Sequence, residues 1–386
     1  MKKKVILILF IVLILYSNVS AQDNLNNSFI EEQMDLTNNI QIDNLLKELM
    51  DENEIYFEGN TKDMILKLIK GEKIIEGKSV GKSIGKIFLK ELSFSLNLLS
   101  KVLIITIISA ILTNLQNTFE ESSISQFANY FTYILIAILV ITSFGQLMDM
   151  VKISVNRMTN FMEILLPILL TLLVATGGPN TRIMFHPMIL GAVNIMGLMV
   201  KNIIFPLIYF SFIVSILSNL SNRGELGKLS ELGRQIITFI ISAAFTIFVG
   251  ILTIYGLSTK IDGITIRTAK FAVDKFLPIV GGFLSDAVDA VIGSSAIIKN
   301  GMGIVGLITL ILIILIPLIK VIVLLLIYSI TGAVIEPIAS PNIVKFFSDV
   351  SKTLLLILIS MVSIGIMFFI TVTIIVDTSN SLLMLR

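Results

Sequence analysis

Two carboxylates, Asp286 and Asp289, have the spacing that could support acid–base chemistry. They are three residues apart, so on a helix they would share one face. Paired carboxylates can divide the roles of acid and base between them. However, intramembrane proteases usually place two aspartates on different spans, a pattern that this short spacing does not meet. We therefore interpret the pair as non-catalytic and expect that the chain is not an enzyme.

Other catalytic motifs are missing from the sequence. The chain has no cysteine and a single histidine, His186, which excludes thiol chemistry and the two-histidine zinc motif. Gly-Lys-Ser occurs at 77–79 and 81–83, but a phosphate loop needs a glycine five residues before the Gly-Lys pair, where Glu72 and Glu76 stand. His186 has no evident catalytic partner, so we interpret it as an interfacial histidine. We expect no cofactor and no metal.

Two further charges, Glu163 and Lys320, lie within apolar runs. A charge near the bilayer centre costs about 2.5–3.5 kcal/mol, so such residues normally face the bundle interior and find a partner. They could border a polar path or a substrate site. Alternatively, Glu163 could lie at the interface and Lys320 could extend its ammonium to the membrane surface. We hypothesise that the two residues pair across the bundle.

The stretch 276–306 lies between two long apolar runs and is unusually rich in glycine, including Gly281 and Gly282. It also contains Lys299 and Asn300 beside the aspartates described above. Glycine weakens helices, and non-helical backbone at membrane depth survives only inside protein or beside a water-filled cavity. The stretch therefore predicts either a broken, re-entrant element or an amphipathic helix lying in the interface.

Composition indicates a membrane protein. Of its 386 residues, 55% are hydrophobic and only 15% charged, with a mean hydropathy of +0.93. An average soluble domain has about 25% charged residues. The net charge of +2 is too small to indicate nucleic acid binding. We predict an integral membrane protein whose partners include membrane lipids.

The first 101 residues predict a signal peptide and a polar segment. Residues 1–21 have a basic start, a short apolar core and a small-residue site, so we expect cleavage between Ala21 and Gln22. Residues 22–101 would then be non-cytoplasmic, first acidic, with one short amphipathic helix, and then lysine-rich. In the lysine-rich part Lys78, Lys82, Lys86 and Lys90 would form one helical stripe. This stripe could bind a membrane surface, dock an acidic partner or simply be solvated.

Residues 102–386 predict an all-α transmembrane helix bundle. The run 184–218 is divided by Lys201, Asn202 and Pro206 and could be one broken span or a hairpin. The total is therefore seven or eight spans. The expected spans are 102–118, 128–148, 160–177, 184–218, 235–256, 303–328 and 353–376.

The chain resembles the stage III sporulation protein AE family of endospore-forming bacteria. The resemblance covers the cleavable signal, the polar segment and about seven spans. Its most specific residues are Phe276–Asp286, continuing through Asp289 to Lys299-Asn300-Gly301, with weaker support from the Gly-Gly-Pro turn at 177–179. The resemblance implies a subunit of the channel complex between mother cell and forespore.

That resemblance also implies a location and partners. The location would be the mother-cell membrane, in the part that becomes the outer forespore membrane. The partners would be other stage III sporulation channel subunits, both ring-forming and ATPase components. The alternative function is a secondary transporter or permease acting alone, which broken spans and buried charges would suit.

Overall fold

The computed structural model describes residues 40–55, 59–72, 74, 77–117, 122–176, 179–220, 225–276 and 281–384. The predicted signal peptide and its cleavage site at Ala21 and Gln22 lie outside these residues. Within them every element is helical, so the predicted all-α fold is confirmed. The elements are α3 (Ile40–Asn53), α4 (Thr61–Ile69), α5 (Gly77–Asn117), α6 (Ser122–Ala175), α7 (Pro179–Met199), the π-helix η1 (Val200–Ile204), α8 (Phe205–Leu220), α9 (Glu225–Phe276), α10 (Gly281–Ile335) and α11 (Pro341–Met384).

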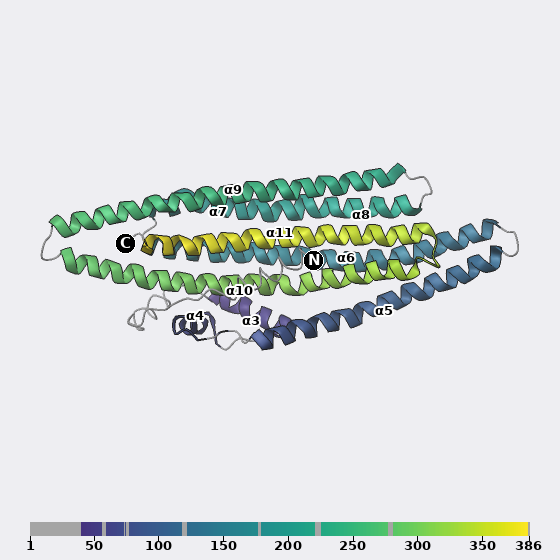
Figure 1. The fold of residues 1–386 in the computed structure, drawn as a ribbon, viewed down its shortest axis with the longest axis horizontal. Helices are drawn as coiled ribbons and strands as arrows, with labels where there is room; N and C mark the ends of the chain where they lie inside the picture. Colours follow the sequence, from purple (N-terminus) through teal and green to yellow (C-terminus); the bar gives the residue numbers. More distant parts are fainter. Residues whose placement is uncertain are drawn as a thin grey trace.

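The long helices run alongside one another and the chain reverses direction at each connection between them (Figure 1). The five longest contain between 41 and 55 residues. At 1.5 Å per residue they are about 60–80 Å long, well beyond the roughly 30 Å of bilayer hydrocarbon. Six stretches of the described residues are long and apolar enough to cross a membrane: 81–108, 130–175, 187–220, 226–255, 291–335 and 341–377.

The expected seven or eight spans are reduced to six because two of them are one helix. The runs 128–148 and 160–177 belong to the continuous helix α6. The polar residues between them, from Asp149 to Thr159, include neither glycine nor proline. Polar side chains change what a helix can face, but they do not end it. The expected boundary at residues 101/102 likewise falls inside α5.

The run 184–218 forms one broken passage rather than a hairpin. Helix α7 continues into α8 through η1, whose closing bond joins the Phe205 N–H to the Val200 carbonyl. Pro206 follows immediately, and it lacks the N–H that would bond the Asn202 carbonyl. The wider π turn accommodates this missing bond without reversing the chain.

The glycine-rich stretch is helical from Gly281 onward, within α10. Of the two alternatives, the broken element is therefore wrong for residues 281–306, and the interfacial helix stays a prediction; residues 277–280 lie outside the described residues. The glycines serve close packing instead. A Cβ at Gly301 would lie 2.7 Å from Ile65 of α4, and one at Gly306 would lie 2.5 Å from Leu165 of α6. At Gly303 it would collide with Val376 of α11.

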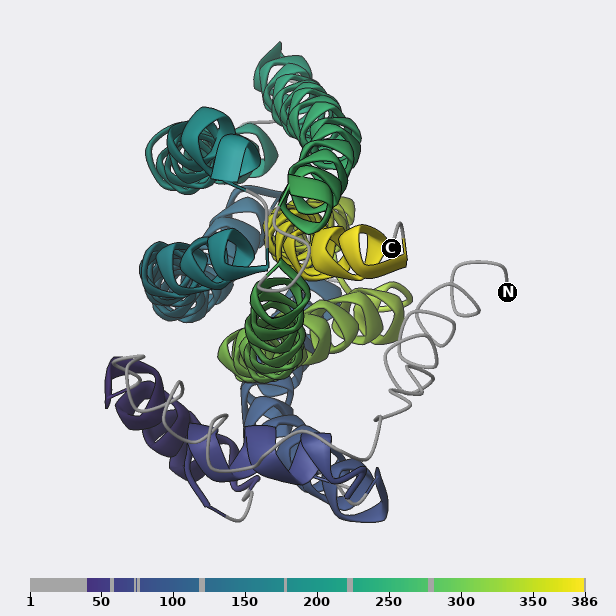
Figure 2. The ribbon, with the colours of Figure 1, turned by 90° about the vertical axis from the view of Figure 1, so that its left-hand side faces the viewer.

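The described part of the acidic N-terminal segment, which begins at Ile40, packs against the bundle. The predicted amphipathic helix is α3, which buries Ile42, Leu46 and Leu49. Both α3 and α4 contact α10, and α3 also contacts α6. Figure 2, which views the bundle end-on, shows α3, α4 and α5 on one side of it and α7, α8 and α9 on the opposite side.

Candidate functional site: a polar junction of helices α8, α9 and α11

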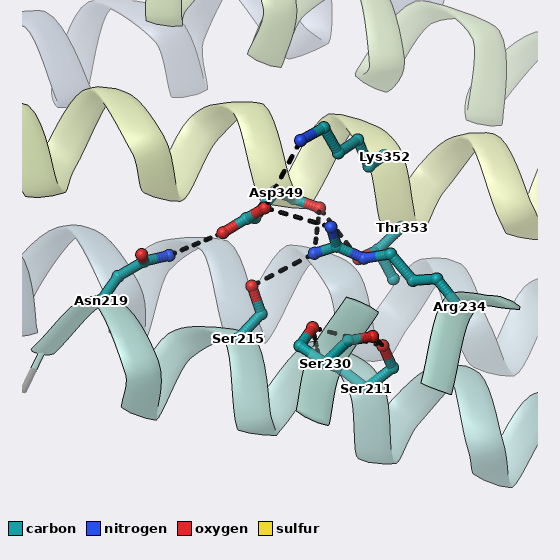
Figure 3. A network of polar contacts seen from close by, with 8 residues as sticks. All are labelled: Ser211, Ser215, Asn219, Ser230, Arg234, Asp349, Lys352 and Thr353. Carbon is teal, nitrogen blue, oxygen red and sulfur yellow. Dashed lines mark hydrogen bonds and ion pairs between the residues drawn. The ribbon is translucent and has the colours of Figure 1, made fainter. Parts of the chain in front are cut away.

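A buried ion pair connects α9 to α11. The Arg234 Nη1 atom lies 3.1 Å from Asp349 Oδ1, and the two side chains are only 15% and 14% exposed. The second guanidinium nitrogen donates to the Ser215 hydroxyl of α8 at 3.2 Å (Figure 3). It also donates to the Asp349 backbone carbonyl at 3.5 Å. One arginine therefore links three helices.

The Asp349 carboxylate is engaged on both oxygens. Its Oδ2 accepts a hydrogen bond of 2.9 Å from the Asn219 amide of α8, and Lys352 lies 3.9 Å from Oδ1. Beside this pair, the hydroxyls of Ser211 and Ser230 donate to each other's backbone carbonyls at 2.9 and 3.0 Å. These reciprocal bonds join α8 to α9. We call this network the polar junction; its members are Ser211, Ser215, Asn219, Ser230, Arg234, Asp349 and Lys352.

The spacing of polar residues explains why the junction forms. Ser211, Ser215 and Asn219 recur every four residues and therefore share one face of α8. Ser230 and Arg234 have the same spacing on α9. This periodicity predicts a polar face on each of the two helices. Nothing in the sequence indicated that Asp349, more than 100 residues away, would be the partner of Arg234.

The junction borders a cleft of about 770 Å³ between α8, α9 and α11. Four basic side chains and two acidic ones line it, together with serines and Phe239: Lys228, Arg234, Lys345, Lys352, Glu231 and Asp349. The Asp349 carboxylate and the Arg234 guanidinium are committed to a charge-assisted hydrogen bond with each other. The arrangement holds helices together and offers a polar surface.

Lys299, a predicted site residue, is fully buried in the core. Its ammonium donates a 2.7 Å hydrogen bond to the Ile375 carbonyl of α11, and the Asp377 carboxylate interacts with it electrostatically. A carbonyl within a helix has a second lone pair for such a bond. The neighbouring Asn300 is partly buried. Lys299 therefore anchors α10 to α11.

Lys320 pairs with Glu91 of α5, at 3.7 Å, and not with Glu163. The hypothesis of a Glu163–Lys320 pair is therefore wrong. Glu163 lies on the exposed face of α6. The hypothesis failed because it placed the first apolar helix after residue 101, whereas α5 begins at Gly77 and brings Glu91 alongside α10.

The remaining predicted residues are not brought to the junction. Gly281, Gly282, Asp286 and Asp289 occupy the first three turns of α10, and their side chains lie outside what the structure describes. Figure 1 shows that α10 begins at the end of the bundle opposite the α8–α9 connection, near which the junction lies. The aspartate pair and the polar junction are thus separate features.

Comparison with known proteins gives a consistent result. Residues 59–379 match the family model described as stage III sporulation protein AE. The chain is 32% identical over 326 residues to a curated protein named "Stage III sporulation protein AE" from Bacillus subtilis (strain 168). The alignment covers 84% of this chain and 82% of that protein. No solved structure matches significantly.

Proposed function

The chain belongs to the stage III sporulation protein AE family, and from this premise we propose that it is a non-catalytic membrane subunit of the channel complex linking mother cell and forespore. The family model matches residues 59–379, a range that includes all six apolar helices found among the described residues. That coverage is the observation that carries the proposal, because it applies to the whole membrane domain rather than to one motif.

The arrangement of polar groups supports a scaffold role. The polar junction uses its charges to connect α8, α9 and α11, and Lys299 and Lys320 connect α10 to its neighbours. The sequence has no phosphate loop, so we propose that a separate ATPase subunit supplies energy. Ring-forming subunits would be the other partners. We place the protein in the mother-cell membrane that becomes the outer forespore membrane.

Gene deletion in the spore-forming host tests the proposal. We expect the deletion strain to lose late forespore gene expression, because the channel complex would lack one of its membrane subunits. Wild-type protein supplied from the mother cell should restore it, whereas protein supplied only from the forespore should not. Normal late expression in the deletion strain would contradict the proposal.

The cleft of about 770 Å³ favours a second candidate, a secondary transporter acting alone. A polar cleft between membrane helices is where transporters bind solute. Uptake by the purified chain in lipid vesicles would support this alternative. Exchanging Lys228, a cleft residue outside the Arg234–Asp349 ion pair, for alanine should then reduce uptake, which separates a solute site from a structural connection.

A further inference from the structure

The outer face of α6 changes character along its length. Exposed residues recur every three or four positions, and the first of them, Phe131, Ile134 and Ile138, are apolar. Further along the same helix, every exposed position from 142 to 163 is polar except Ile153, and the partly exposed Asn156 lies on the same face. We call this second part the α6 stripe; its members are Thr142, Gln146, Asp149, Asn156, Asn160 and Glu163.

Neighbouring helices place the α6 stripe at membrane depth. Thr159 of α6 packs against Gly197 of α7, and the residues beside that glycine, Ile195 and Leu198, are more than half exposed. Gln146 and Ile153 share a cleft with Leu312 of α10, near the middle of its apolar stretch 291–335. At this level along the bundle, therefore, the exposed surface of α7 is apolar and the α6 stripe is polar.

Charges on the polar side reinforce this asymmetry. Arg157 of α6 forms ion pairs with Glu48 at 2.9 Å and Glu52 at 2.7 Å, both on α3. These two glutamates are 59% and 45% exposed. Side chains as exposed as these are not expected to face bilayer hydrocarbon, because placing one charge near the bilayer centre costs about 2.5–3.5 kcal/mol. The surroundings of α3 and the α6 stripe must supply water or polar groups.

A cleft of about 460 Å³ adjoins the stripe between α3, α6 and α10. It is lined by Asn53, whose side chain is 1% exposed. The Asn53 amide donates to the Leu49 and Leu312 carbonyls at 2.7 and 3.2 Å, but its Oδ1 accepts no hydrogen bond from the described protein. Pro317, also in the lining, leaves the helical bond to the Ile313 carbonyl unmade. Buried acceptors of this kind are normally met by water.

We propose that the α6 stripe and this cleft border water inside the membrane and form one wall of a hydrophilic conduit. The ligands are water and small hydrated solutes, and the opposite side of the bundle, at α7 and α9, faces lipid. The proposal depends on the proposed function in one respect: other subunits, or other copies of this chain, must form the remaining walls of the conduit.

Cysteine labelling tests the proposal, since the natural chain has no cysteine. Single variants Gln146→Cys, Asp149→Cys and Asn160→Cys are compared with Ile138→Cys, on the same face, and Ile195→Cys, at the same level. Membranes from sporulating cells are treated with a charged, membrane-impermeant methanethiosulfonate. Because the reactive thiolate forms only where water solvates it, we expect the stripe positions to react at least about tenfold faster than both controls.

Each other result overturns the proposal. Equally fast reaction at Ile195→Cys would show that this level lies outside the bilayer. Slow reaction at all stripe positions would show that lipid or a partner polypeptide covers them. Thiol titration after denaturation confirms that each variant is present and unmodified. Capture of partner subunits is measured on the same membranes, so failure of the channel assignment and failure of the water-facing stripe give different results.

Discussion

The guanidinium of Arg234 on α9 lies 3.1 Å from the carboxylate of Asp349 on α11, in a site where both side chains are about 85% buried. Removing either partner leaves the other charge buried without its counterpart, which is far more costly than losing an exposed pair. The surrounding hydrogen bonds from Ser215 and Asn219 position the pair but cannot replace a charge.

We therefore predict that Arg234→Ala and Asp349→Ala each lower the free energy of unfolding by about 2–4 kcal/mol, and that the double variant loses clearly less than their sum. Denaturant unfolding in detergent micelles measures this cycle. The control is Lys352→Ala, whose ammonium is 3.9 Å away and largely exposed and should contribute no more than about 0.5 kcal/mol. Additive effects of Arg234 and Asp349 would contradict the pairing.

Lys320 and Glu91 should also be coupled. Their exposures of 25% and 20% and the 3.7 Å separation indicate a moderate interaction, so we expect a coupling free energy of about 0.5–1.5 kcal/mol between Lys320→Gln and Glu91→Gln. Glu163→Gln is the matched control, because Glu163 lies on the exposed face of α6. Coupling of Lys320 to Glu163 instead would contradict the pairing of α10 with α5 through these two residues.

The close-packing glycines of α10 should be intolerant of a methyl group. We predict that Gly303→Ala and Gly306→Ala destabilise the protein by about 1–3 kcal/mol, because the new Cβ would collide with Val376 or Leu165. At Gly293 nothing lies within 4 Å of an added Cβ, so Gly293→Ala should be neutral or stabilise the helix by up to about 1 kcal/mol. Thermal unfolding of the three variants provides the comparison. Equal effects would indicate that these glycines serve helix flexibility instead.

Glu54 should make stability depend on acid pH. Its hydrogen bond with Lys86, at 2.5 Å, and the charges of Lys86 and Lys90 lower the pKa of this carboxyl. A lowered pKa means that the stabilisation is complete above the ordinary carboxyl pKa, about 4.3, and is lost as pH falls through the folded value. The melting temperature of Glu54→Gln should therefore fall less steeply with acidification below about pH 4.5 than that of the wild type. Parallel pH profiles would show that the pair has no influence in solution.

The six candidate spans also predict a topology. If the polar segment starts outside, an even number of crossings places the end of α11 outside and the α10–α11 connection inside. Cysteine at Glu72, before α5, should then react with an impermeant reagent in intact cells, whereas cysteine at Ser340 should react only after permeabilisation. The reverse pattern would contradict a cleaved signal peptide.

Helix positions could largely be predicted from hydropathy, but helix partners could not. The apolar runs of α8, α10 and α11 each reappear inside a described helix. The prediction of two spans, 128–148 and 160–177, failed because both lie in the single helix α6. Hydropathy reports the surroundings of a segment and not where a helix ends. A polar stretch within one long helix therefore looks like a loop between two spans. The stretch at 276–306 was misread for a related reason. Its glycines could mark either a break or a close contact, and the difference depends on Ile65, Leu165 and Val376, which are remote in sequence.

The same limit applies to the site. The four-residue spacing alone predicts a polar face on α8, formed by Ser211, Ser215 and Asn219. That face is completed by Asp349, whose sequence surroundings resemble any amphipathic helix start. Arginine at 234 could have paired with several nearby acids, including Glu225 and Glu231. Only the packing of α9 on α11 selects Asp349.

Affinity purification from sporulating cells tests the central claim most directly. The tagged chain is extracted in mild detergent and its assembly is sized and identified by mass spectrometry. We predict a large complex that contains the ring-forming and ATPase subunits, and that breaks down when Arg234 alone is replaced by alanine, because Asp349 is then buried without its partner. A chain that purifies alone and carries solute into vesicles without partners would contradict the claim.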